Sequence, residues 1–252
     1  MSTVLATYNI KGGVGKTSAA VNLAYLASRD GLRTLLWDLD PQGGSTYLFR
    51  VKPKVRGGGD KLVRLKSDVD KLIKGTDHDG LDLLPADFSY RHMDLALERF
   101  KRPTRRLARV LAPLAGEYDW VFLDCPPSVS LVSESVFEAA DVVLVPIVPA
   151  TLSARTIGQL DGLVAEARKG HKKGPQVLAF FSMVDGRKKL HRQVMETLRA
   201  ERTDVLEAAI PASVEVERMG IERDAIATFA PRGRAAPAYA SLWREVRERV
   251  EG

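Results

Sequence analysis

The stretch that decides the fold of this chain is Lys11-Gly12-Gly13-Val14-Gly15-Lys16-Thr17. It lies between an apolar, β-like segment (residues 4–10) and a helix-like segment (residues 18–28). A strand that enters a loop of small residues and then a helix brings backbone N–H groups and a helix N-terminus to one point, which suits a polyphosphate. In such a loop Lys16 would reach the β- and γ-phosphates, and the Thr17 hydroxyl would bind Mg²⁺.

The loop departs from the common phosphate-loop pattern, G-x-x-x-x-G-K-[ST], at its first position. Ile10 stands where that pattern has its first glycine, and Lys11 adds a second lysine before the paired glycines. The alternative interpretation is a tight turn that needs glycines only for backbone geometry. The flanking strand and helix patterns favour the phosphate loop.

Length and composition indicate one globular α/β domain over residues 1–252, with a basic variable insertion at about 51–80. The chain has 252 residues, of which 45% are hydrophobic and 28% are charged, and this is enough for a full core. The sequence shows neither a signal-peptide pattern nor an apolar run of membrane-spanning length. Cys125 is the only cysteine, so no internal disulfide can form. We therefore expect a cytoplasmic protein.

The positive charge is clustered. The formal net charge is +6 and the pI is about 9.4. Nine basic and three acidic residues lie in the range 50–74, and six basic and no acidic residues lie in the range 99–109. Such patches can bind polyanions, or they can simply be the solvated faces of helices.

Strand-like and helix-like patterns alternate along the chain. This is typical of a mostly parallel, doubly wound sheet with helices on both faces, here in a P-loop NTPase architecture. We expect strands at 3–9, 34–39, 81–86, 118–124, 141–148, 176–184 and up to 210–211, with the strand at 141–148 in a central position. We expect helices at 18–28, 61–74, 90–114 (interrupted by Pro103), 153–169, 189–202 and 234–250.

Two aspartates follow predicted strands. Asp40 comes after the strand at 34–39, and Asp124 ends the apolar run Trp120-Val121-Phe122-Leu123. Ligands bind at the carboxyl ends of parallel strands, and a carboxylate ending an apolar strand downstream of a phosphate loop is typical of a Mg²⁺-shell residue. Taken alone, Asp40-Pro41 could be a turn initiator. Cys125 is interpreted as a small buried residue rather than a nucleophile, because no histidine lies near it.

These motifs, in this order, resemble those of the ParA/MinD family of dimerising ATPases, whose deviant Walker A loop has the form K-G-G-x-G-K-T. The resemblance continues in Asp38-x-Asp40-Pro41-Gln42-Gly43, Asp124-x-Pro126-Pro127, Met183-x-Asp185-x-Arg187, Ile210-Pro211 and the Ala-Pro-to-Ala-Tyr segment at 230–239. The family commonly has Asn-Ala-Thr after the switch glycine, whereas this chain has Gly44-Ser45-Thr46.

The resemblance implies a set of site residues and ATP with Mg²⁺. Lys11 would reach the nucleotide of a partner subunit, Asp40 would organise the attacking water, and Lys11, Lys16 and Asp40 would be catalytic. Thr17, Asp40 and Asp124 would surround the metal. The nucleotide would contact Lys11, Gly12, Gly13, Val14, Gly15, Lys16, Thr17 and Ser18, with Met183 and Pro211 on the adenine side.

The resemblance also implies function. Because only two residues precede the first strand, we expect no N-terminal helix-turn-helix and hence binding of non-specific, nucleoid DNA by an ATP-dependent homodimer. The expected DNA contacts are Arg187, Lys188, Lys189, Arg192, Arg218 and Arg223. Glu215 and Glu217 weaken the last region, where Lys169, Lys172 and Lys173 could substitute. A partner protein would stimulate hydrolysis and so position DNA or another large cargo.

Two alternatives remain open at this point. One is a membrane-bound regulator of the MinD kind, which is disfavoured because no basic amphipathic helix follows the segment at 234–250. The other is a metabolic or metal-insertion ATPase, although the chain has no Cys-x-x-Cys pair for cluster assembly. The four histidines have no ligand spacing, so no metal site other than Mg²⁺ is expected.

Overall fold

The computed structural model describes residues 2–167 and 174–252, and its centre is one eight-stranded sheet in the order β3-β4-β2-β5-β1-β6-β7-β8. All neighbouring strands are parallel except β3 and β4. The strands are β1 (Thr3–Thr7), β2 (Thr34–Asp38), β3 (Lys74–Gly75), β4 (Leu81–Leu84), β5 (Trp120–Asp124), β6 (Val142–Ile147), β7 (Gln176–Val184) and β8 (Val205–Pro211). The predicted mostly parallel sheet is confirmed.

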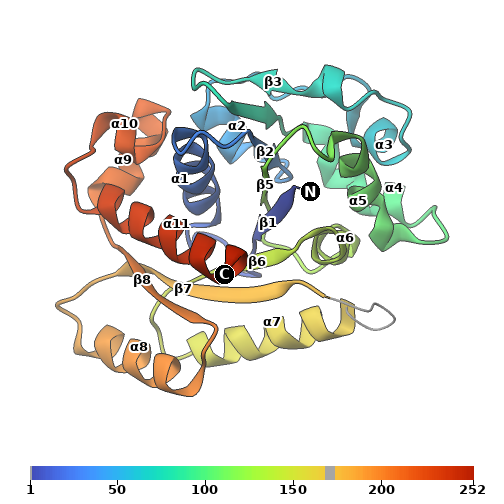
Figure 1. Cartoon of the computed structure of the whole chain (residues 1–252). Helices are drawn as coiled ribbons and strands as arrows, with labels where there is room; N and C mark the ends of the chain where they lie inside the picture. The colour runs from blue at the N-terminus through green and yellow to red at the C-terminus, as the bar shows by residue number, and fades with distance from the viewer. Residues whose placement is uncertain (1, 168–173) are drawn as a thin grey trace.

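Helices cover both faces of this sheet (Figure 1). One apolar cluster packs α1 (Lys16–Arg29), α9 (Val214–Glu222), α10 (Ile226–Phe229) and α11 (Ala235–Glu251) on one face. The other face carries α3 (Gly58–Val63), α4 (Met93–Leu97), α5 (Arg106–Leu111), α6 (Leu131–Ala139), α7 (Ser153–Ala167) and α8 (Lys189–Glu201). The doubly wound architecture is therefore confirmed.

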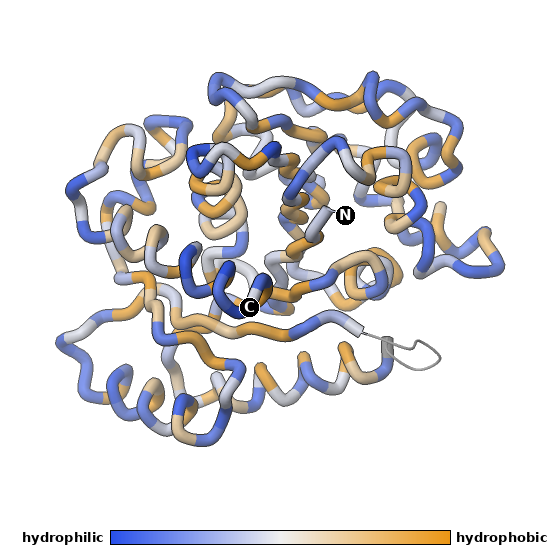
Figure 2. The backbone as a smooth tube through the Cα atoms, in the orientation of Figure 1, coloured by the Kyte–Doolittle hydropathy of each residue, from blue (hydrophilic) through white to orange (hydrophobic). Residues whose placement is uncertain are grey.

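The central strands are apolar because both of their faces are covered. All residues of β2, β5 and β6 are buried, which is the pattern expected of parallel strands between two helical layers. Figure 2 shows hydrophobic residues along the inner strands and hydrophilic residues along the outer helices and loops. The predicted central position of β6 is confirmed, since it lies between β1 and β7.

The predicted interruption of the helix at 90–114 by Pro103 is confirmed, but the range is divided into more pieces than predicted. The structure divides this range into η2 (Phe88–His92), α4, η3 (Pro103–Arg105), α5 and η4 (Ala112–Leu114). Pro103 begins a 3₁₀ turn and Pro113 lies in another. Proline lacks the N–H that a continuing helix needs, so the chain forms short helices that turn around the core.

The predicted basic helix at 61–74 is also wrong. Helix α3 ends at Val63, and Leu65 adopts a left-handed φ of 57°, which a helix interior does not allow. A 3₁₀ turn, η1 (Asp70–Leu72), follows, and β3 then pairs antiparallel with β4. The insertion at 51–80 thus contributes β3, the edge strand of the sheet.

Several short helices were not predicted. One is α2 (Gly44–Leu48), which follows the Asp40 loop directly. Helix α6 carries a sequence signal that could have revealed it, because Ser130 stands at its N-cap and donates its N–H to Ser133 Oγ at 2.8 Å. No helix in the described ranges is long and apolar enough to cross a membrane.

Candidate nucleotide-binding site

The phosphate-binding loop occupies residues 8–15, between the end of β1 and the start of α1. Gly13 and Gly15 have φ values of 71° and 97°, a region that glycine enters without strain. The Val14 side chain is buried and anchors the loop, whereas Gly12 and Gly13 are exposed. The predicted strand–loop–helix unit is therefore present.

Asn9 fixes the start of this loop. Its side-chain amide donates to the Pro146 carbonyl at 2.8 Å, and its side-chain oxygen accepts from the Lys11 N–H at 2.9 Å. Asn9 is buried, so both contacts are shielded from competing water. Asn9 was not predicted as a site residue, because its partner Pro146 lies 137 residues away along the sequence.

The two lysines of the loop face different surroundings. Lys16 is buried, and its ammonium donates to the Lys11 carbonyl at 3.0 Å. Burial lowers the pKa of Lys16, while the nearby carboxylate of Asp124 acts in the opposite direction. The Lys11 side chain is exposed, and its ammonium has no hydrogen bond or ion pair within residues 2–167 and 174–252.

Asp124 is a buried carboxylate of the site, and two hydroxyl groups hold it. Thr17 Oγ1 donates to Asp124 Oδ1 at 3.2 Å, and Ser45 Oγ donates to Asp124 Oδ2 at 2.6 Å. The side chain is fully buried. Burial raises the pKa of Asp124, and the two hydroxyl donors oppose this shift. Helix α1, helix α2 and strand β5 therefore meet at one carboxylate.

The two aspartates of the second strand have different environments. Asp38 is buried and accepts hydrogen bonds from the N–H and hydroxyl of Thr46 at 2.8 and 2.7 Å. Burial, and then the negative charge of Asp124, raise the pKa of Asp38. Asp40 is half-buried, lines the pocket and accepts from the Gln42 N–H at 2.9 Å. Asp38 thus fixes the loop, and Asp40 stays available to a ligand.

These oxygen donors fit a magnesium ion. The Thr17 hydroxyl and the carboxylates of Asp40 and Asp124 are hard ligands of the kind that Mg²⁺ prefers. No group of three His, Cys, Asp or Glu side chains forms a metal cage in the described ranges. A cation here would complete its shell with phosphate oxygens and water, as Mg²⁺ commonly does beside nucleotides.

The phosphate loop opens into a pocket of about 340 Å³. Its far wall includes both predicted adenine-side residues, Met183 and Pro211, and it also includes Ser182, which our sequence analysis missed. A β-carbon built on Gly15 would lie 2.8 Å from Ser182 Oγ, so the loop and β7 approach closely. The complete lining is Gly12, Gly13, Gly15, Lys16, Thr17, Ser18, Asp40, Pro127, Ser182, Met183, Ile210, Pro211, Ala212, Ser213, Val216, Glu217 and Tyr239.

Four of the predicted DNA-contacting residues lie together at the start of α8. Arg187, Lys188, Lys189 and Arg192 are all exposed. Arg187 forms an ion pair with Asp185 at 3.0 Å. The Arg187 side chain lowers the pKa of Asp185 to about 2. This end of α8 therefore presents three lysine and arginine side chains that have no carboxylate partner among the described residues.

The other two predicted DNA contacts, Arg218 and Arg223, are engaged within the protein. Arg218 pairs with Glu222 one turn along α9. The Nε atom of Arg223 donates to the Tyr47 carbonyl at 3.0 Å, and its guanidinium lies 4.4 Å from the centre of the Tyr47 ring. Lys169, Lys172 and Lys173 lie outside the described residues.

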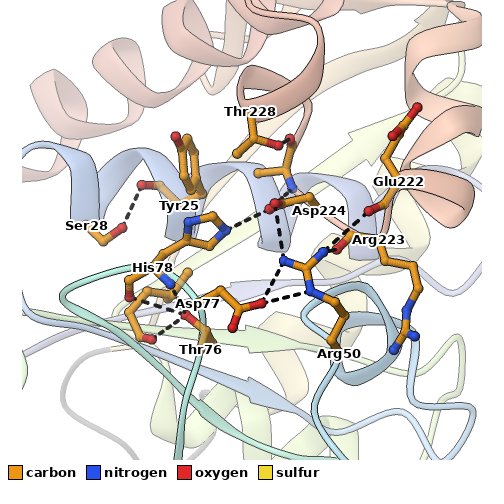
Figure 3. Close-up of polar contacts among 12 residues, drawn as sticks. Tyr25, Ser28, Arg50, Thr76, Asp77, His78, Glu222, Arg223, Asp224 and Thr228 are labelled. Atoms are coloured by element: carbon orange, nitrogen blue, oxygen red, sulfur yellow. Dashed lines mark hydrogen bonds and ion pairs between the residues drawn. The ribbon is translucent and has the colours of Figure 1, made fainter.

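A second arginine makes the contact between α2 and α9 reciprocal. Figure 3 shows the half of this contact that Arg50 makes with the backbone of Arg223. Arg50 donates to the Arg223 carbonyl at 2.8 Å, while Arg223 donates to Tyr47 near the end of α2. Cationic donors are favoured at helix C-termini, where carbonyl groups have no partner in the helix. Asp77 holds Arg50 at 2.7 Å. We call this pair of contacts the arginine clasp.

The clasp joins two elements of the nucleotide site. Helix α2 supplies Ser45 to Asp124, and α9 supplies Val216 and Glu217 to the pocket wall. In Figure 3 His78 faces Asp224 beside the clasp, at 2.7 Å between Nε2 and Oδ1. Sequence reasoning could not find this arrangement, because its residues come from four separate segments of the chain: 45–50, 77–78, 124 and 216–224.

Comparison with known proteins gives a consistent result. A family model described as an AAA domain matches residues 2–176. The chain is 31% identical to the sporulation initiation inhibitor protein Soj of Bacillus subtilis, over 98% of both chains. It is 34% identical to the chromosome-partitioning ATPase Soj of Thermus thermophilus, over 98% of this chain and 96% of that protein.

The solved structure of cobyrinic acid a,c-diamide synthase from Mycobacterium smegmatis, with a bound ATP analogue and magnesium, also matches. It superposes with a TM-score of 0.85 at 26% identity, over 100% of this chain and 97% of that one. The geometry of the phosphate loop, the carboxylates of Asp40 and Asp124 beside it and these relatives all indicate the same family. The chain belongs to the ParA/MinD family of P-loop ATPases with a deviant Walker A motif.

Proposed function

We propose that this protein is a ParA-type positioning ATPase. It dimerises when ATP is bound, binds DNA without sequence preference, and is released from DNA when a partner protein stimulates hydrolysis. The observation that carries this proposal is Lys11. Its ammonium is exposed on the phosphate loop and has no partner in the described chain, which is what a residue acting on a second subunit requires.

Within one subunit, different pocket residues bind the phosphates, the Mg²⁺ ion and the attacking water. Lys16 and the glycine loop neutralise and hold the phosphates, and Thr17 and Asp124 would hold Mg²⁺, which supplies further positive charge there. Asp40, the half-buried carboxylate of the pocket, orients the attacking water. Lys11 of the opposite subunit adds charge in trans, as an arginine finger does.

The exposed basic residues at the start of α8 are the proposed DNA contacts. Lys188, Lys189 and Arg192 carry this role, because they have no carboxylate partner among the described residues. Arg218 and Arg223 contribute less, since Glu222 and Tyr47 already engage them. Several relatives are named as chromosome-partitioning proteins, and partition of DNA or positioning of a large cargo is the activity that we propose here.

The packing of α11 argues against the MinD-like alternative, in which the protein would bind a membrane. Its apolar residues Leu242, Trp243 and Val246 are at most 4% exposed, and they pack in the cluster that contains α1. A lipid surface would need these side chains to be free. This burial supports DNA rather than a membrane as the surface that we propose for the ATP-bound dimer.

Two variants test the proposal through the mass of the protein in solution. With ATP and Mg²⁺, Asp40→Ala should bind ATP, fail to hydrolyse it and accumulate as a dimer in sedimentation velocity. Lys11→Ala should bind nucleotide as a monomer and form no dimer. Lys52→Ala is a matched control, because Lys52 is an exposed lysine away from the pocket. Hydrolysis by Asp40→Ala at the parent rate, or a normal Lys11→Ala dimer, would contradict the proposed roles.

A further inference from the structure

The positive charge of the protein is concentrated away from the nucleotide site. The segment 50–114 contains sixteen lysine and arginine residues and nine aspartate and glutamate residues, a net charge of +7, whereas the whole chain carries +6. The rest of the molecule is therefore close to neutral, at −1. The start of α8 is only a local basic cluster, and any long-range attraction of a polyanion comes mainly from 50–114.

The fold brings the two basic runs of this segment together. Arg106 is only 7% exposed, and its Nε donates to the Val63 carbonyl at the end of α3, at 2.7 Å. The same guanidinium lies 4.0 Å from the centre of the Phe100 ring. Arg106 thus joins the end of α3, the loop after α4 and the start of α5 into one surface.

Six cationic side chains surround this junction, and all are exposed. We call them the α3–α5 basic face: Lys61, Lys66, Arg99, Lys101, Arg102 and Arg109. Within the described residues, the one ion pair among them is a long contact of 3.9 Å between Arg99 and Asp60. Glu98 is the one acidic residue between positions 95 and 116. The face is therefore rich in cations without counter-charges.

The internal electrostatics of the face are unfavourable. Arg106 and Arg109 are three residues apart on α5, so these two like charges are neighbours on one helix. Burial, and then the positive charge of Arg109, lower the pKa of Arg106. A polyanion that bound here would relieve this repulsion and release counterions.

We propose that the α3–α5 basic face is a second contact surface for the phosphate backbone of duplex DNA, separate from the α8 surface. This inference rests on the proposed DNA-binding function. In Figure 1, α3, α4 and α5 lie at one end of the helical layer on their face of the sheet, and α8 lies at the other end. None of the six residues lines the nucleotide pocket, so the face can bind DNA without changing the ATP site. Two such surfaces would let one dimer contact more than one DNA segment.

The test compares three variants that each lack three positive charges. The first is Lys101→Ala/Arg102→Ala/Arg109→Ala on the basic face. The second is Lys188→Ala/Lys189→Ala/Arg192→Ala on α8. The third is a matched control, Arg29→Ala/Arg232→Ala/Arg244→Ala, at exposed positions elsewhere. Each is titrated onto a labelled non-specific duplex with ATP and Mg²⁺, between about 50 and 200 mM salt.

We expect the basic-face variant to bind at least tenfold more weakly and to reduce the slope of log affinity against log salt by about 2 to 3, since each phosphate contact contributes about 0.9. The control should stay within about twofold of the parent, and all three should keep the parent ATP affinity. A basic-face variant that matches the control would overturn the inference and leave an acidic protein segment as the candidate ligand. If the parent binds no DNA in any nucleotide state, the proposed function fails instead.

Discussion

The hydroxyl of Ser45 donates to the Walker B carboxylate of Asp124 at 2.6 Å, and it ties the first turn of α2 to the end of β5. Thr17 holds the other oxygen of Asp124. The loop after Asp40 is therefore attached directly to the buried carboxylate of the proposed Mg²⁺ site.

Replacing Ser45 by alanine should destabilise the nucleotide-free protein. The change removes a donor from a fully buried carboxylate, and hydrogen bonds to charged groups contribute about 1.5–3 kcal/mol. Urea unfolding at neutral pH measures this loss of unfolding free energy. Ser241→Ala is a control with a serine that is not buried. A change below about 0.5 kcal/mol for Ser45→Ala would show that the bond has little effect on the nucleotide-free fold.

Gly15→Ala should abolish tight nucleotide binding. A β-carbon at this position would lie 2.8 Å from Ser182 Oγ, and Gly15 has a φ of 97°. Left-handed backbone costs a non-glycine residue about 1–2 kcal/mol, so the loop must shift. We expect ADP affinity, measured by calorimetry, to fall at least tenfold. Gly186→Ala is the control, because its β-carbon meets nothing within 4 Å.

The arginine clasp can be tested through backbone strain. Arg223 adopts a φ of 54°, and its side chain holds Tyr47. Arg223→Ala loses the contact and keeps the strain, while Arg223→Gly loses the contact and relieves the strain. We expect both to be less stable than the parent in urea unfolding, with the glycine variant about 1 kcal/mol more stable than the alanine variant. Equal stabilities would argue against strain at Arg223.

The sequence was most informative where local pattern decides structure. The phosphate loop between β1 and α1 follows from glycine spacing, and Asp124 follows from an apolar strand that ends in a carboxylate. The buried run of β6 likewise predicted a central strand. Each of these signals lies within about ten residues, so no knowledge of distant partners was needed to recognise it.

The remaining features depend on contacts between distant segments. Asn9 matters because Pro146 lies beside it, Ser45 because Asp124 lies beside it, and Ser182 because β7 approaches Gly15. Nothing in the local sequence marks these partners. The range 90–114 was predicted in part, because the break at Pro103 is visible in the sequence. Its further division into short α-helices and 3₁₀ turns was not predicted, because the apolar spacing suits longer helices.

The most direct test of the account is the binding of a non-specific DNA duplex with ATP and Mg²⁺, with ADP and Mg²⁺, and without nucleotide, over a salt series. We expect tight binding with ATP and Mg²⁺ and not in the other two states, with an affinity that falls steeply as salt rises. We also expect Lys11→Ala to lose this binding. Equal affinity in all three states, or no binding in any of them, would contradict an ATP-controlled cycle on DNA.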